Sequence, residues 1–203
     1  MMQRIKNLTN RIGLLACLLL CLTASAAMGA TLIVDNTTDN AALTACTSAP
    51  NDCSLRGAIA AAAPGDTVTF DSGLFMTPRL IRLNGTELLI NKNLTVTGVG
   101  GVIIDGNNAS GVFISNAPGP ITVNLSGMTV TGGRPAIPGG GIECNGTLTL
   151  TNMTVTGNVA NAGGGIFQES GTLNIVNSTI SDNSSFGSGG GIFAGTMNMT
   201  GST

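Results

Sequence analysis

Two glutamates, Glu143 and Glu169, are the side chains of this sequence best spaced for acid–base chemistry. Both follow a Gly-Gly-Gly-Ile string in an internal repeat, and their positions differ by one residue when the repeats are superimposed. Glycoside hydrolysis needs two carboxylates about 5 to 9.5 Å apart, a separation that neighbouring coils can supply. The alternative is that both are solvated loop charges, because they lack a basic partner and an aromatic subsite. A lyase would need clustered Asp to hold Ca²⁺ and a basic residue, and Arg134 stands nearly alone among the coils.

The residue types that are missing exclude several kinds of site. The 203 residues contain no His, Trp or Tyr, so neither His-dependent catalysis nor a His-ligated metal can be built. Eight basic residues and six Phe form no visible phosphate-binding face or base-stacking platform. We therefore predict no catalytic residue, no cofactor, no metal and no nucleic-acid partner. Surface glycans and proteins of host or neighbouring cells are the candidate partners.

A second candidate surface consists of threonines spaced two residues apart. In a stack of strands such residues form outward columns, about 7 Å apart along a strand and about 4.7 Å apart between coils. Flat Thr-x-Thr arrays resemble the ice-binding surfaces of antifreeze proteins. The alternative is that Thr is simply a favourable solvent-facing strand residue. The predicted columns contain Thr95, Thr97, Thr129, Thr131, Thr154, Thr156, Thr179 and Ser181.

A repeat of about 25 residues must position these side chains. The string Gly-Thr-Leu-Thr-Leu at 146–150 recurs with small changes at 171–175 and 195–199, and the Gly-Gly-Gly-Ile string recurs with it. Alternation of apolar and polar residues within each repeat indicates short half-buried strands. Because neither helices nor tight hairpin turns separate them, we predict a β-solenoid of parallel coils. The predicted interior columns are Val96, Val130, Val155 and Ile180, and Ile142, Ile166 and Ile192.

The first 26 residues have the order of features found in signal peptides. A positively charged segment ending at Arg11 precedes an apolar run over 12–22 and the small-residue triplet Ala-Ser-Ala at 24–26. This order is typical of exported proteins.

The cysteines that follow fit export into an oxidising compartment. There a close pair such as Cys46 and Cys53 is usually a disulfide, with two free thiols as the alternative. Cys144 is either a buried small hydrophobic residue or a pairing partner for another chain.

The string Cys53-Ser-Leu-Arg-Gly-Ala-Ile59, followed by alanines and Pro-Gly-Asp at 64–66, is the most distinctive in the chain. It resembles the Cys-Ser-Leu-Arg-Glu-Ala motif of the CSLREA domain of exported bacterial proteins, and the glycine-rich coils are similar to those of polymorphic outer membrane proteins. The resemblance covers about residues 31–203. It implies a right-handed parallel β-helix, exported to the cell surface, the outer membrane or the extracellular space.

The same string predicts a short helix over about 55–63 that covers the open end of the solenoid. Ser54 is a natural N-cap, and a Glu at position 57 would complete a capping box. This chain has Gly57 instead, and Gly inside a helix costs about 1 kcal/mol relative to Ala. The sequence therefore predicts that Gly57→Glu stabilises the protein.

The predicted organisation is all-β: a signal peptide over 1–26, an N-terminal cap over 27–79 with the Cys pair and the short helix, and parallel β-helix coils over 80–203. The last coil is incomplete at Thr203, so we expect a fragment of a longer protein that holds further coils and any membrane anchor. The expected function is that of a non-enzymatic, exported cell-surface protein, adhesin-like or a structural stalk. A polysaccharide lyase or glycosidase and an ice-binding protein are the alternatives.

Overall fold

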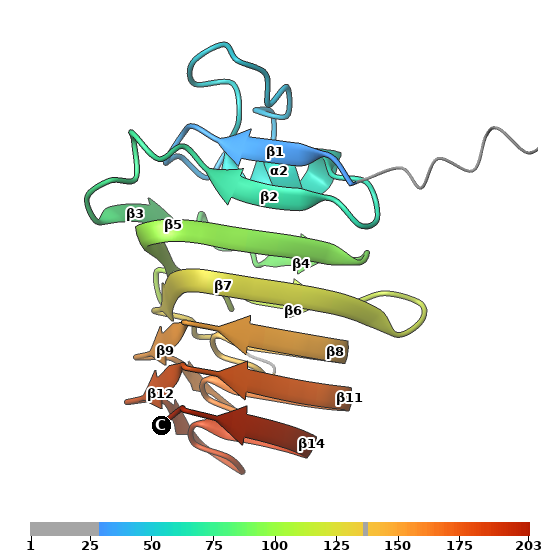
Figure 1. The fold of residues 1–203 in the computed structure, drawn as a ribbon. Coiled ribbons are helices and arrows are strands. Elements are labelled where there is room, and N and C mark those ends of the chain that lie inside the picture. The colour runs from blue at the N-terminus through green and yellow to red at the C-terminus, as the bar shows by residue number, and fades with distance from the viewer. Residues whose placement is uncertain (1–28, 136–137) are drawn as a thin grey trace, which may run out of the picture.

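The computed structural model describes residues 29–135 and 138–203, so the predicted signal peptide over 1–26 lies outside the described residues. Within these ranges the chain is a β-solenoid of about five turns with one short helix, α2 (Leu55–Ala61). Figure 1 shows the strands stacked one above another, with α2 at the N-terminal end of the stack. The prediction of an all-β parallel β-helix with a short capping helix is confirmed.

Strand segments of successive coils stack into three faces, which we call faces A, B and C. Face A consists of β1 (Thr31–Val34), β2 (Thr67–Phe70), and residues 94–97 of β5 (Leu94–Asp105), 121–126 of β7 (Ile121–Thr131), 146–151 of β8 (Ile142–Thr151), 171–176 of β11 (Ile166–Val176) and 195–200 of β14 (Ile192–Thr200). It is the broad sheet that runs from the blue to the red end of the stack in Figure 1. Neighbouring segments pair in parallel throughout this face.

Faces B and C complete each coil. Face B contains β3 (Arg79–Arg82), residues 102–105 of β5, residues 128–131 of β7, β9 (Thr154–Thr156) and β12 (Thr179–Ser181). Face C contains β4 (Leu88–Ile90), β6 (Phe113–Ser115), and the first three residues of β8, β11 and β14. The short strands β10 (Val159–Ala160) and β13 (Ser184–Ser185) form a separate parallel pair. β5 and β7 each run from face A into face B without a break.

The interior is formed by columns of aliphatic side chains, because alternate residues of each strand are buried. In β8 buried and partly exposed residues alternate along the whole strand. Val130, Val155 and Ile180 stack as predicted. Ile142, Ile166 and Ile192 do so as well. Burying one such side chain contributes about 1.5–3 kcal/mol, which lets these columns hold a fold that has few aromatic residues.

Val96 does not join the predicted interior column. It lies on face A, where it is aligned with Val68 and Leu125, whereas Val130 lies on face B and is aligned with Ile104. The segments at 94–97 and 128–131 have the same alternating pattern because both are half-buried strands. The alternation does not show on which face a strand lies, and the two segments belong to different faces.

The solenoid begins earlier in the chain than the predicted boundary at residue 80. β1 and β2 already pair in parallel and continue directly into β5. Residues 27–79 therefore contain two rungs of face A as well as the cap. Helix α2 contacts β1, β2 and β4, and so covers the N-terminal end of the stack.

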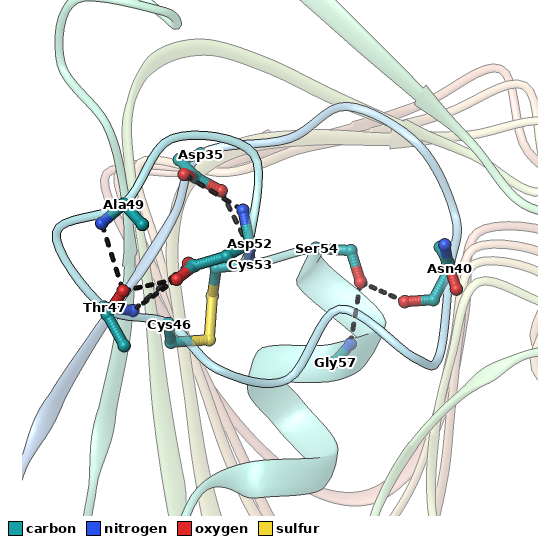
Figure 2. Close-up of a disulfide and its surroundings, with 9 residues drawn as sticks. All are labelled: Asp35, Asn40, Cys46, Thr47, Ala49, Asp52, Cys53, Ser54 and Gly57. Carbon is teal, nitrogen blue, oxygen red and sulfur yellow. Dashed lines mark hydrogen bonds between the residues drawn. A yellow bond between two sulfur atoms is a disulfide. The ribbon is translucent and has the colours of Figure 1, made fainter.

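The N-terminus of helix α2 is held by Ser54 and by the chain segment before it (Figure 2). Ser54 Oγ accepts a hydrogen bond from the Gly57 backbone N–H at 3.0 Å and donates one to the Asn40 carbonyl. The Ser54 backbone N–H donates to the Leu43 carbonyl at 3.1 Å. Ser54 is thus the N-cap, as predicted. Its backbone N–H already has a hydrogen-bond acceptor, so no Glu side chain at position 57 is needed to accept from it.

Gly57 is required by the close approach of this segment. A Cβ at Gly57 would lie 1.8 Å from the Leu43 carbonyl oxygen, far inside the 3.0 Å that real Cβ contacts respect. The prediction that Gly57→Glu stabilises the protein is therefore wrong. Its premise was local helix propensity, whereas the residue is fixed by a contact with a backbone atom fourteen positions away.

The predicted disulfide is confirmed, with the Cys46 and Cys53 sulfurs 2.02 Å apart. Two aspartates support the loop that it closes (Figure 2). Asp35 accepts a hydrogen bond from the Cys53 backbone N–H at 2.9 Å, and Asp52 accepts one from the Thr47 backbone N–H at 3.1 Å. The disulfide and these carboxylates fix the segment that leads into Ser54 and helix α2.

Candidate functional site

The eight residues predicted to form two threonine columns lie on two different faces. Thr95 and Thr97 are on face A, where they are aligned with Asn124 and Ser126. The other six are on face B, and Thr129 is aligned there with Ile103 of β5 and Thr154 of β9. The predicted columns are therefore interrupted, because β5 contributes its Thr-Val-Thr segment to face A and an Ile-Ile-Asp segment to face B.

The threonine block on face B is short and has charged neighbours. Thr129, Thr154 and Thr179 form one column, and Thr156 is aligned with Ser181. On the preceding coil, Asp105 lies next to Thr131 and pairs with Arg82 at 3.3 Å. Face B thus presents uncharged hydroxyls over three rungs only.

Face A carries the larger array of uncharged polar side chains, and most of its members are not among the residues predicted from the sequence. Three columns run along it in strict register, two of them with seven members. Column 1 is Thr122, Thr147, Thr172 and Thr196. Column 2 is Thr31, Thr67, Thr95, Asn124, Thr149, Asn174 and Asn198. Column 3 is Ile33, Thr69, Thr97, Ser126, Thr151, Val176 and Thr200.

The chemistry of face A is uniform. No member of the three columns carries a charge, and all but Ile33 and Val176 are Thr, Asn or Ser. Among the described residues, no hydrogen-bond partner within the chain is found for the hydroxyls of the central threonines at 147, 149, 151 and 172. These hydroxyls are therefore able to donate to and accept from a partner outside the chain.

The asparagines of column 2 are held by their neighbours. Asn198 donates from Nδ2 to Asn174 Oδ1 at 2.9 Å, and Asn124 donates to Thr95 Oγ1 at 3.4 Å. Bonds between rungs fix the amide orientations, so these parts of the column form an ordered surface.

The paired glutamates lie on face C. Glu143 is aligned with Ile114 on one side and Phe167 on the other. Glu169 lies at a β-bulge: Gln168 is aligned with Cys144 and Ser170 with Asn145, so Glu169 is the extra residue between them. The two glutamates are therefore not at equivalent positions: Phe167 is aligned with Glu143, and Glu169 lies two residues further along the strand.

The surroundings of the Glu143 carboxyl shift its pKa. Partial burial raises the pKa of the Glu143 carboxyl, and the nearby charges of Glu169 and Glu87 raise it further. Its Oε2 is buried and has no hydrogen-bond partner. Neither ion pair found in the described residues involves these glutamates. A raised carboxyl pKa is one of the properties that a general acid needs.

The space beside Glu143 is narrow. It is lined by Phe113, Pro135, Pro138 and Gly139, and it does not admit a water molecule. A sugar bound at Glu143 would therefore have to lie on the open surface of face C rather than in a cleft.

An aromatic pair that was not predicted from the sequence lies next to Glu143. Phe167 and Phe193 stack with ring centroids 5.1 Å apart and an angle of 12° between the rings. Both phenylalanines directly follow a Gly-Gly-Gly-Ile string, so the repeat itself contained the signal. Their register on face C follows from the aligned isoleucines that precede them.

Two cations near the cap already have partners within the chain. Arg56 pairs with Asp39, with Nε and Oδ1 2.6 Å apart, and donates to the carbonyls of Thr86 and Glu87. Lys92 donates to the carbonyls of Ile59 and Ala62 at the C-terminal end of α2, where positive charge is favourable. The groove between them, with a volume of about 290 Å³, therefore has little free positive charge for an anion.

Cys144 is completely buried, with Ser115 and Gln168 at the aligned positions of the neighbouring rungs. Burial raises the pKa of its thiol. Of the two interpretations left open by the sequence, the structure confirms the buried small residue.

The described residues contain no group of three or more His, Cys, Asp or Glu side chains that could hold a metal ion. In the same part of the chain no helix is long and apolar enough to cross a membrane. No protein-family model, curated protein or solved structure matches the sequence or the fold of this chain.

Proposed function

We propose that this chain is a non-enzymatic, exported protein of the cell surface that uses face A as an adhesin-like contact surface or as the wall of a stalk. The observation that carries the proposal is the array on face A: three columns of uncharged side chains, in register over as many as seven rungs. An array of this length without a charge is unusual for a solvent-facing surface, which ordinarily contains both signs of charge.

Two features of the sequence support export and display. The signal-peptide pattern over 1–26 and the Cys53-Ser-Leu-Arg-Gly-Ala string both resemble features of exported proteins, the second those with CSLREA domains and polymorphic outer membrane repeats. The Cys46–Cys53 disulfide is of the kind that persists in oxidising compartments.

The dimensions of face A suit contact with an extended partner. Seven rungs spaced about 4.8 Å apart give a face about 29 Å long. Its backbone is fixed by parallel pairing on every rung, so a partner meets side chains whose spacing does not change.

The experiment that tests this proposal has two measurements. The full chain, carrying an epitope tag, is expressed in cells with an outer membrane, and antibody labelling and protease digestion are compared in intact and lysed cells. We expect the tag outside the cells, either as labelling and cleavage on intact cells or as protein released into the medium. The purified chain is then incubated with a panel of soluble and insoluble polysaccharides, and we expect no turnover. A chain that stays inside the cells, or that cleaves a polysaccharide, would contradict the proposal.

A polysaccharide-active enzyme is the second candidate, and the arrangement around Glu143 favours it. The Glu143 carboxyl, whose pKa is raised, lies near a second carboxylate, Glu169. Glycosidases use such a pair, one carboxyl as the general acid and the other as the base or nucleophile. If a polysaccharide of the panel is cleaved, Glu143→Gln is expected to abolish cleavage while Glu87→Gln leaves most of it. Equal activity of the wild type and the Glu143 variant would exclude this site.

A further inference from the structure

Face A repeats in two directions with fixed spacings. Rungs lie about 4.8 Å apart, and outward side chains of one strand lie about 6.6–7 Å apart. Columns 1, 2 and 3 therefore form a rectangular grid. Thr147, Thr149 and Thr151 occupy one complete row on β8, the aligned side chains of β7 and β11 form the adjacent rows, and those of β14 form the row beyond β11.

The threonine side chains of this grid are stiff. Threonine has two heavy atoms on Cβ, so few χ1 rotamers are open to it on a strand. Each threonine presents one hydroxyl and one methyl group, and the central hydroxyls have no partner within the described residues. Little side-chain entropy is lost when such a surface meets an ordered partner.

The absence of charge and of aromatic rings on this grid narrows the chemistry of the partner. Phosphates, acidic peptides and cationic polymers are recognised by opposite charges, and the three columns have none. Neutral sugars are commonly held by flat aromatic side chains. The stacked Phe167 and Phe193 lie on face C and not on face A. What remains is a neutral, repeating partner made of hydrogen-bond donors and acceptors.

Ordered water has these properties. Oxygen atoms on the faces of an ice crystal repeat at distances close to the two spacings of face A, each oxygen both donates and accepts, and the surface carries no net charge. Threonine hydroxyls can join such a lattice by hydrogen bonds while their methyl groups fill the spaces between water molecules.

We propose that face A binds ice through columns 1, 2 and 3. This inference rests on the proposed function, in which face A is the contact surface, and names the partner of that surface. It differs from the threonine columns predicted from the sequence, because six of those eight residues lie on face B. The threonine row at 147, 149 and 151 is the centre of the binding surface.

The test compares one substitution on each face. Thr149→Lys places a charged side chain at the centre of the grid, and Thr154→Lys places the same side chain on face B, where it is the matched control. Circular dichroism first verifies that both variants keep the β-sheet signal of the wild type. Thr149→Val, which removes the hydroxyl and keeps the shape, separates the loss of the hydrogen bond from the steric effect of lysine.

Binding is measured as thermal hysteresis and as the adsorption of fluorescently labelled protein to a growing ice crystal. We expect both for the wild type and for Thr154→Lys. We expect both to be lost with Thr149→Lys and to be weakened with Thr149→Val. Absence of adsorption by the folded wild type would overturn the inference. Loss with Thr154→Lys and not with Thr149→Lys would assign ice binding to face B and overturn it as well.

Two further measurements separate this inference from the proposed function. Retention of the wild type on insoluble cellulose or chitin, with no adsorption to ice, would make the partner a neutral polysaccharide and would refute ice as the partner. Exposure on intact cells does not depend on the partner. A chain that is exposed but does not bind ice therefore contradicts the inference alone, whereas a chain that binds ice but stays inside the cell contradicts the proposed function alone.

Discussion

Replacing Gly57 by alanine is expected to destabilise the protein, although the same change at an exposed helix position would stabilise it. In a helix interior, alanine is favoured over glycine by about 1 kcal/mol. At Gly57 the new Cβ would lie 1.8 Å from the Leu43 carbonyl oxygen. The segment carrying Leu43 must therefore move by at least 3.0 − 1.8 = 1.2 Å to restore an acceptable contact.

This movement acts on two hydrogen bonds. The Ser54 backbone N–H donates to the Leu43 carbonyl at 3.1 Å, and Ser54 Oγ donates to the Asn40 carbonyl of the same segment. Losing the partner of a buried polar group costs about 1–3 kcal/mol per group. Two such losses, reduced by the gain of about 1 kcal/mol in helix propensity, lower the free energy of unfolding by about 3 kcal/mol. For a chain of this length that corresponds to a fall in Tm of about 6–12 °C.

The assay is urea unfolding of Gly57→Ala followed by far-ultraviolet circular dichroism, with thermal unfolding as a second measurement. Ala60→Gly is the matched control, because Ala60 is an exposed residue of the same helix. It tests helix propensity alone and is expected to cost about 1 kcal/mol. A Gly57→Ala variant with a urea midpoint equal to or above that of the wild type would show that the Leu43 carbonyl does not restrict this position. Gly57→Glu is expected to lose at least as much stability as the alanine variant.

Three further predictions concern the core, the face C carboxyl and the disulfide. Leu148→Ala, at a fully buried position, is expected to lower the free energy of unfolding by about 2–5 kcal/mol in urea titrations; a loss below that of an exposed Leu89→Ala control would contradict it. Because the pKa of Glu143 is raised in the folded chain, the fold binds more protons there than the unfolded chain, and stability falls as pH rises from below 4.5 through the raised value. Glu143→Gln should therefore flatten that dependence and be the more stable protein at neutral pH, and an unchanged pH profile would contradict the assignment. Replacing Cys46 and Cys53 together by serine is expected to cost about 2 kcal/mol, as loop closure over a short segment predicts; the free energies of unfolding of the wild type with and without reductant, from urea titrations, should differ by the same amount, and no difference would contradict the prediction.

The sequence was sufficient to predict most of the fold. The repeat predicted the parallel stack, and the alternation of apolar and polar residues predicted which side chains lie inside, as the confirmed column of Val130, Val155 and Ile180 shows. The spacing of Cys46 and Cys53 predicted their disulfide. Each of these is a local or strictly periodic property, which one coil is enough to establish.

The candidate site was predicted less well. The strings containing Thr147 and Thr172 recur with the repeat, but the shared Thr-Val-Thr pattern predicts columns that join face B residues to Thr95 and Thr97, which lie on face A. Both faces are half buried, so both give the same alternation with a period of two. The pattern therefore indicates that a residue points outward without indicating the face from which it does so.

The repeat and its alternation specify the inward or outward direction of each side chain and the parallel stacking of the coils. Where each strand turns a corner, so that β5 and β7 contribute to two faces, is seen only in the folded chain. The same is true of the contact between the chain near Leu43 and Gly57. Alternation arises from the burial of one side of a single strand, so a single strand is enough to show it. The position of a corner and the approach of a distant segment depend on contacts between residues far apart in the chain, which leave no periodic signal in the sequence.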